Sequence, residues 1–143
     1  MNIQQITVFL ENRTGQLANL TGLLAKENVD LRAISIAETA DYGLVRLIVD
    51  DAHKASAVLL AHGDILSMTP VWAVEVPDRP TGLSEVLKVL ADAHVDVEYM
   101  YSLFTHRDGY AYMIMRVDDD ARFLSALGEN RIRVMGCEDL GLK

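Results

Sequence analysis

The fold is decided by residues 12–50, NRTGQLANLTGLLAKENVDLRAISIAETADYGLVRLIVD, because residues 78–116, DRPTGLSEVLKVLADAHVDVEYMYSLFTHRDGYAYMIMR, repeat them. With a shift of 66 residues and no gap, nine of the 39 aligned pairs are identical, including Val29-Asp30 with Val95-Asp96. Many other pairs exchange one hydrophobic residue for another. A single register through a loop, a helix, a turn and a strand predicts a duplicated structural unit.

Each copy has the pattern strand, helix, strand, strand, helix, strand. The first domain, residues 1–70, is predicted to have strands at 3–10, 31–39, 44–49 and 65–69, and helices at 16–28 and 52–61. The second domain, residues 71–143, is predicted to have strands at 71–76, 97–105, 110–117 and 132–135. Its helices should follow the turn at 78–81 and a cap at Asp119 or Asp120. Residues 138–143 are expected to be peripheral.

A right-handed crossover makes the first two strands of each unit parallel, and the hairpin places the third strand between them. We therefore expect antiparallel sheets of strand order 4-1-3-2 with both helices on one face. This is the ferredoxin-like α+β arrangement, a βαββαβ unit present twice. Because that fold supports many functions, the function must be argued from residues.

Composition narrows the class of partner. The net charge of −8 disfavours nucleic acid and anionic membranes, and we expect neither as a partner. The single cysteine, Cys137, and the lack of a signal-like start indicate a cytoplasmic protein. Four histidines without paired spacing predict no metal site, and no phosphate-binding or dinucleotide glycine pattern is present, so no cofactor is expected.

The turn Asn12-Arg13-Thr14-Gly15-Gln16-Leu17 resembles that of ACT domains, the amino-acid-sensing modules attached to many biosynthetic enzymes. Val29-Asp30-Leu31 and Tyr42-Gly43 extend this resemblance, which covers nearly the whole chain twice. The resemblance implies a stand-alone tandem ACT protein, a non-catalytic regulator that binds an amino acid between its repeats. It also implies a homo-oligomer.

An amino acid offers a carboxylate, which exposed N–H groups at a helix start can bind, and an ammonium, which needs acceptors. ACT domains commonly pair edge to edge through their second strands, which would bring the Asn12 turn of one repeat to the second strand of the other. The predicted site is Asn12, Arg13, Thr14, Gly15, Gln16 and Leu17 with Asp96, Tyr99, Met100, Tyr101 and Ser102. A weaker second site is Asp78, Thr81, Gly82, Leu83, Asp30 and Ser35. Its turn carries Thr81 where the first copy has Gly15, a poor choice if that position needs a positive φ.

Two other functions are open at this point. Acylphosphatases use an Arg and an Asn on a ferredoxin-like sandwich, and Arg13 lies in a comparable turn. A scaffolding module that pairs through edge strands is the other alternative.

Overall fold

The computed structural model describes residues 2–11, 13–38 and 42–143, and it divides into two compact units. The N-terminal unit comprises Gln4–Thr69 and Gly141–Lys143. The C-terminal unit comprises Pro70–Leu140 together with Asn2 and Ile3. Each unit therefore includes a few residues from the far end of the chain.

The N-terminal unit contains β1 (Ile3–Glu11), α1 (Gln16–Lys26), β2 (Leu31–Glu38), β3 (Tyr42–Val49), α2 (Ala52–His62) and the first part of β4 (Ile65–Pro77). Its strands β1 and β2 both pair antiparallel with β3, and Ile6 and Ile34 both lie opposite Leu47. The core joins alternate residues of β1 to the buried side of the two helices, where Leu24 and Leu59 lie.

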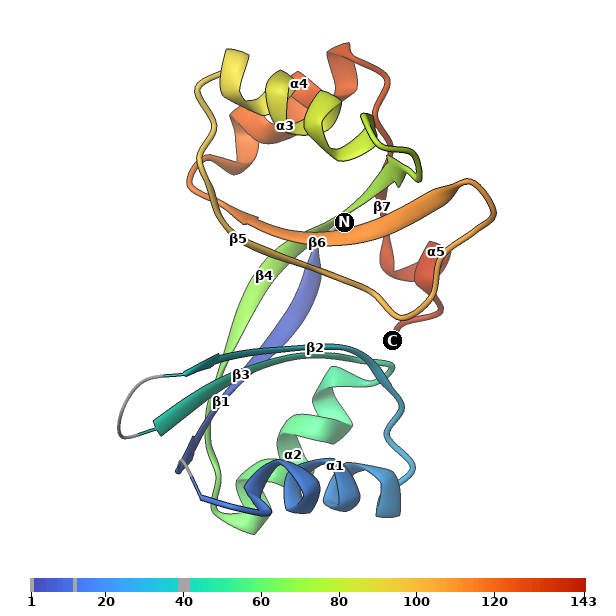
Figure 1. Ribbon diagram of the computed structural model, residues 1–143. Helices are drawn as coiled ribbons and strands as arrows, with labels where there is room; N and C mark the ends of the chain where they lie inside the picture. The colour runs from blue at the N-terminus through green and yellow to red at the C-terminus, as the bar shows by residue number, and fades with distance from the viewer. Residues whose placement is uncertain (1, 12, 39–41) are drawn as a thin grey trace. The chain divides into compact units, whose positions relative to one another are not determined.

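The C-terminal unit contains the rest of β4, α3 (Gly82–Asp92), β5 (Val97–Ser102), β6 (Tyr110–Val117), α4 (Asp120–Glu129), β7 (Val134–Met135) and α5 (Cys137–Leu140). Antiparallel pairing joins β7 to β4, β4 to β6 and β6 to β5. In this unit α3 and α4 lie side by side (Figure 1). Val86 and Phe123 from these helices share one core with Val74 and Met115 of the sheet.

The two repeats start their second helices in the same way and leave their first helices without a side-chain cap. The Asp51 carboxylate accepts the Lys54 N–H at 3.1 Å, and the Asp119 carboxylate accepts the Arg122 N–H at 3.0 Å. The N-cap positions of α1 and α3 make no such side-chain hydrogen bond. The N–H groups of Gln16 and Gly82 donate to the carbonyls of Arg13 and Arg79, which leaves the later N–H groups of each first turn for an external anion.

The predicted single register is correct as far as the second strand of each repeat and wrong from the third. Ile34 of β2 corresponds to Met100 of β5, a shift of 66, but their partners Leu47 and Met115 differ by 68. The second repeat therefore has two more residues in its hairpin loop. A surface loop tolerates such an insertion without disturbing the strands that it joins.

Two further expectations are corrected. The strands predicted at 65–69 and 71–76 form one strand, β4, in which the carbonyl of Pro70 accepts a hydrogen bond from Arg116 at 2.9 Å. The tail expected to be peripheral contains α5, and Leu140 is buried. The last residue is also held, because the Lys143 N–H donates to the Asp50 carbonyl at 2.8 Å.

Candidate functional site

The turn before α1 has a backbone that requires glycine. Gly15 has φ +88°, in the left-handed region, and a Cβ added there would meet nothing within 4 Å. The glycine is therefore needed for its backbone angle rather than for space. The Gly15 carbonyl accepts the Asn19 N–H at 2.9 Å, which begins the helix. Asn12, the other predicted key residue of this turn, lies outside the described residues.

A cavity of about 170 Å³ lies beside this turn. It is lined by Leu10, Glu11, Arg13, Gln16, Leu17, Ile36, Gly43 and Val45. The aliphatic side chains come from three strands and α1, whereas the polar ones come from the turn and its flanks. Arg13 is 66% exposed and forms an ion pair with Glu11 at 2.7 Å. Thr14 is exposed and does not line the cavity.

The corresponding turn of the second repeat has a different backbone. Thr81 has φ −93°, so this position needs no positive φ. The next residue, Gly82, has no room for a side chain, because a Cβ there would lie 1.8 Å from the carbonyl oxygen of Pro77. Asp78 is held through its backbone N–H, which donates to the Gly109 carbonyl at 2.9 Å. Leu83 packs against the core of the C-terminal unit.

The two aspartates before the second strands have equivalent backbone roles. The Asp30 N–H donates to the Asp50 carboxylate at 2.9 Å, and the Asp96 N–H donates to the Asp118 carboxylate at the same distance. In return, the carbonyls of Asp30 and Asp96 accept the N–H groups of Asp50 and Asp118. These bonds fix the start of each second strand.

The carboxylates of the same two aspartates have different neighbours. Arg32 donates to the Asp30 carboxylate at 2.7 Å. The second repeat has Glu98 at the position of Arg32, and no ion pair joins Asp96 to a described residue. Asp96 is therefore the better candidate acceptor for a ligand ammonium.

The predicted residues of β5 divide between the two faces of the sheet. Tyr99 and Tyr101 share one face, and Met100 and Ser102 share the other. Met100 packs against the core beneath α3 and α4, Tyr101 is buried, and Ser102 is exposed. Ser35 is half-buried on β2, opposite Arg46. The predicted residues from different repeats lie in different units, so their meeting stays a prediction.

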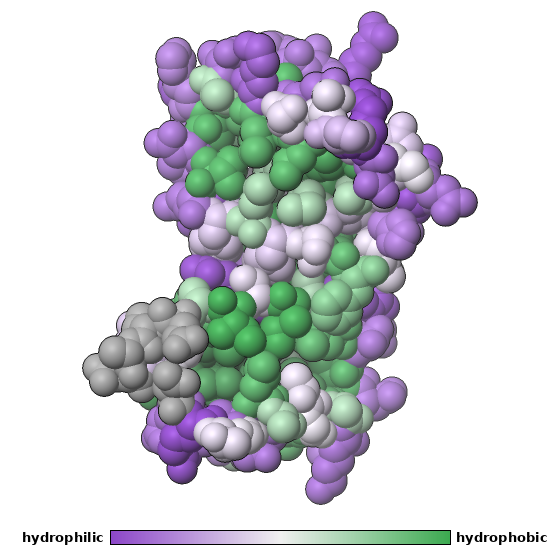
Figure 2. Space-filling view, viewed as in Figure 1, coloured by the Kyte–Doolittle hydropathy of each residue, from purple (hydrophilic) through white to green (hydrophobic). Residues whose placement is uncertain are grey.

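Apolar side chains are exposed on the N-terminal unit. Figure 2 shows them gathered over the part of the unit that contains β2 and β3. Ile36 of β2 is 54% exposed, and the exposed rings of Phe9 and Tyr42 lie 6.0 Å apart. Such a surface favours contact with another apolar surface.

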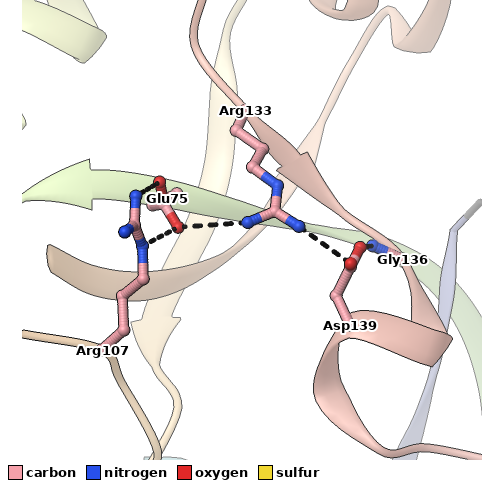
Figure 3. Close-up of polar contacts among 5 residues, drawn as sticks. All are labelled: Glu75, Arg107, Arg133, Gly136 and Asp139. Atoms are coloured by element: carbon pink, nitrogen blue, oxygen red, sulfur yellow. Dashed lines mark hydrogen bonds and ion pairs between the residues drawn. The ribbon is translucent and has the colours of Figure 1, made fainter.

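The sequence reasoning missed a charged cluster in the C-terminal unit, in which the side chain of Glu75 is only 6% exposed (Figure 3). Arg107 donates to both Glu75 oxygens, at 2.9 and 2.8 Å, and Arg133 lies 3.7 Å away. Arg133 also bonds Asp139 at 2.8 Å, and Asp139 accepts the Gly136 N–H. The hydrogen bonds from Arg107 hold the pKa of Glu75 below its usual value, against the effect of burial. The available signal was a single glutamate within an apolar strand, VWAVEV.

The sequence matches the family model of the ACT domain pair over residues 1–141. Among solved structures, protein BT0572 from Bacteroides thetaiotaomicron is 35% identical and has a TM-score of 0.91. That match covers 99% of this chain and 96% of the other. No curated protein matches the sequence.

Two more distant structures share the fold. The regulatory subunit of aspartate kinase from Thermus thermophilus is 16% identical with a TM-score of 0.66, over 88% of this chain and 91% of the other. E. coli aspartokinase III, solved in complex with lysine and aspartate, is 14% identical with a TM-score of 0.52, over 90% of this chain and 31% of the other. Among the described residues, each helix is too short or too polar to cross a lipid bilayer.

Proposed function

Because the chain belongs to the ACT domain pair family, we propose that it is a non-catalytic regulatory protein that binds an amino acid. The observation that carries the proposal is the turn at Gly15, which combines an uncapped helix start with an adjoining cavity of about 170 Å³. N–H groups at a helix start favour a carboxylate, and the aliphatic floor of the cavity favours an apolar group beside it. The two requirements meet in a small amino acid.

The ligand's carboxylate would bind at the start of α1, with Arg13, Thr14, Gln16 and Leu17 around it. Asn12 and Asp96 would accept the hydrogen bonds of its ammonium, since carbonyl and carboxylate oxygens are the acceptors that it needs. The lack of a cationic partner for Asp96 among the described residues supports this role. Tyr99 and Tyr101, which share one face of β5, would line the rest of the site, whereas Met100 and Ser102 lie on the other face.

The proposed site needs a first repeat and a second repeat joined through their second strands. β2 pairs with β3 on one side and carries the exposed Ile36, which favours association along that edge. A homo-oligomer is therefore part of the proposal. Light scattering with and without ligand decides whether the two repeats come from one chain or from two copies.

The weaker second site would consist of Asp78, Thr81, Gly82, Leu83, Asp30 and Ser35. Its ammonium acceptor, Asp30, is already bonded to Arg32 at 2.7 Å. A ligand would have to displace that charge-assisted bond, which lowers the affinity. We propose that the first site is occupied at lower ligand concentrations than the second.

The test is a thermal-shift screen of the full chain against the twenty amino acids, because a ligand that binds only the folded state raises the melting temperature. We expect at least one amino acid to raise the melting temperature of the wild type. The Asn12→Ala variant should need about tenfold more of that amino acid for the same rise. Asn19→Ala, an exposed asparagine of α1 that belongs to neither proposed site, is the matched control and should leave the response nearly unchanged. If no amino acid shifts the melting temperature, the sensor proposal is wrong.

The two alternative functions, a small acylphosphatase-like enzyme and a scaffolding module, are tested by different measurements. Phosphate release from an acyl phosphate would favour the small enzyme, and assembly independent of amino acids would favour the scaffold. The proposal also keeps a cytoplasmic location, based on the single Cys137, and the strand order 4-1-3-2 with both helices on one face for each unit.

A further inference from the structure

The C-terminal unit has a cavity of about 360 Å³ that contains none of the residues proposed to bind the amino acid. It lies between the end of β4, the start of α3 and the loop that follows α4. Val86, Val89 and Ile132 supply apolar lining, while Glu75, Arg131 and Arg133 supply charge. Its volume is within the range of cavities that hold small molecules.

The duplication supplies a direct comparison for this cavity. The equivalent place in the N-terminal unit holds a smaller cavity, of about 210 Å³. Three positions around it are uncharged in the first repeat and charged in the second. The exchanged pairs are Phe9 with Glu75, Gly63 with Arg131, and Ile65 with Arg133. Two positions change the other way, Glu11 with Pro77 and Asp64 with Ile132. Each cavity therefore has two lining carboxylates, and the second repeat differs by the guanidinium groups of Arg131 and Arg133.

The replacement of Gly63 of the first repeat by Arg131 in the second is unfavourable for the backbone conformation at that position. Gly63 and Arg131 both follow a helix in the left-handed region, with φ +94° and +57°. Their backbone hydrogen bonds match, since Gly63 donates to Leu60 and Arg131 donates to Gly128. Glycine adopts this conformation freely, whereas a residue with a Cβ is disfavoured in it. The turn itself therefore gains nothing from arginine over glycine, although α1 and α3 are also followed by a non-glycine residue in this region, Asn28 and His94.

Arg131 is exposed, lines the cavity, and has no ion pair with any described residue. Arg133 differs, because it is bonded to Asp139 and lies near Glu75. Arg131 thus keeps its hydrogen-bond donors available, while Arg133 adds positive charge from a fixed position.

The lining of this cavity carries two carboxylates and two guanidinium groups, and the ion-pair partners of those residues add one further positive charge, although the whole chain carries −8. Four guanidinium groups lie in or beside it, against three carboxylates: Arg79, Arg107, Arg131 and Arg133 against Glu75, Glu85 and Asp139. Guanidinium donors match the oxygen atoms of carboxylates and phosphates in a planar, two-pronged geometry. A local excess of such groups within an acidic surface selects a small anion.

We propose that this cavity binds a small molecule bearing an oxyanion, a carboxylate or a phosphate, through the guanidinium of Arg131. Arg133 supports the binding electrostatically, and Val86, Val89 and Ile132 contact the apolar part of the ligand. The cavity would be a second ligand site, independent of the Gly15 turn. It gives the two repeats different specificities.

The test is isothermal titration of the full chain with inorganic phosphate and, separately, with succinate. The deciding variant is Arg131→Gly, which restores the residue of the first repeat and should leave the melting temperature unchanged or higher. We expect this variant to bind the anion at least tenfold more weakly than the wild type. Arg131→Lys, which keeps the charge but loses the planar fork, should bind with intermediate affinity.

The matched control is His94→Gly. His94 also has a positive φ, +59°, after α3, but it does not line the cavity. This variant should gain the same backbone relief and bind the anion like the wild type.

Binding of phosphate alone or of succinate alone identifies the class of oxyanion and supports the site. Absence of binding of both by the wild type, or unchanged binding by Arg131→Gly, overturns it. The amino-acid response expected for the Gly15 turn should persist in Arg131→Gly, and anion binding should persist in Asn12→Ala. Failure of one proposal is therefore distinguishable from failure of the other.

Discussion

Replacement of Gly82 by alanine tests the close approach of this residue to the backbone of Pro77. An added Cβ would lie 1.8 Å from the Pro77 carbonyl oxygen and 2.9 Å from its carbonyl carbon. Because the obstacle is backbone, the turn and α3 must move apart by more than about 1 Å. Overpacking costs about 1–3 kcal/mol, and this rigid contact belongs at the upper end. Alanine regains at most about 1 kcal/mol of helix propensity, so the net loss should be about 2 kcal/mol.

The assay is thermal unfolding followed by tryptophan fluorescence. Trp72 is the only tryptophan of the chain and packs in the core of the same unit as Gly82. For a unit of 60–100 residues, each kcal/mol shifts the melting temperature by about 4–8 °C, so Gly82→Ala should melt about 8–16 °C lower. Urea unfolding of the same variant should give a lower midpoint with an unchanged slope.

Two control variants separate space from backbone angle. Gly128→Ala in α4 meets nothing within 4 Å and should stabilise the unit slightly, because alanine is the better helix former. Gly15→Ala also meets nothing, but its φ of +88° should cost about 1–2 kcal/mol. A melting temperature of Gly82→Ala within 2 °C of the wild type would refute the steric argument.

Three other variants follow from the C-terminal unit. Asp119→Ala removes the cap of α4 and should lower the unfolding free energy by about 1 kcal/mol, measured by urea unfolding. Phe123→Ala empties a fully buried position that stacks on Trp72, and about 3–5 kcal/mol should be lost by the same measurement. Glu75→Gln weakens the pair with Arg107 and should cost about 1–2 kcal/mol at pH 7. Folding lowers the pKa of Glu75, so the stability difference between Glu75→Gln and the wild type should be present above pH 4.5. It should disappear as the pH falls through the pKa that Glu75 has in the folded protein. A difference that grows towards low pH would contradict the assignment.

Local sequence patterns predicted those parts of the fold that depend on neighbouring residues. Helix α2 was expected at 52–61 and spans Ala52–His62, and the hairpin strand expected at 110–117 is Tyr110–Val117. Apolar spacing and a capping aspartate act within one or two turns of chain, so they are legible in the sequence. The register after the hairpin was wrong because loop length leaves no mark on the strands.

The turns before α1 and α3 show that a sequence pattern alone does not explain why a glycine is needed. A glycine at position 15 and another at position 82 look like the same motif displaced by one residue. The structure gives them different reasons, a left-handed φ at Gly15 and a steric contact with Pro77 at Gly82. A single letter cannot separate these reasons, because both are properties of backbone geometry. The candidate amino-acid site was predicted from the residues of this turn, and the adjoining cavity was not.

The Glu75 cluster was missed for a related reason. A carboxylate with 6% exposure is tolerable only where hydrogen-bonded cations offset the loss of hydration. Those cations, Arg107 and Arg133, come from a hairpin loop and from the approach to β7, so no local window contains the set. The first repeat has Phe9 at the place of Glu75, an exposed ring that needs no partner of this kind. The charged residues of the second repeat therefore depend on one another, and a change at Glu75 alone would leave two guanidinium groups without their common acceptor.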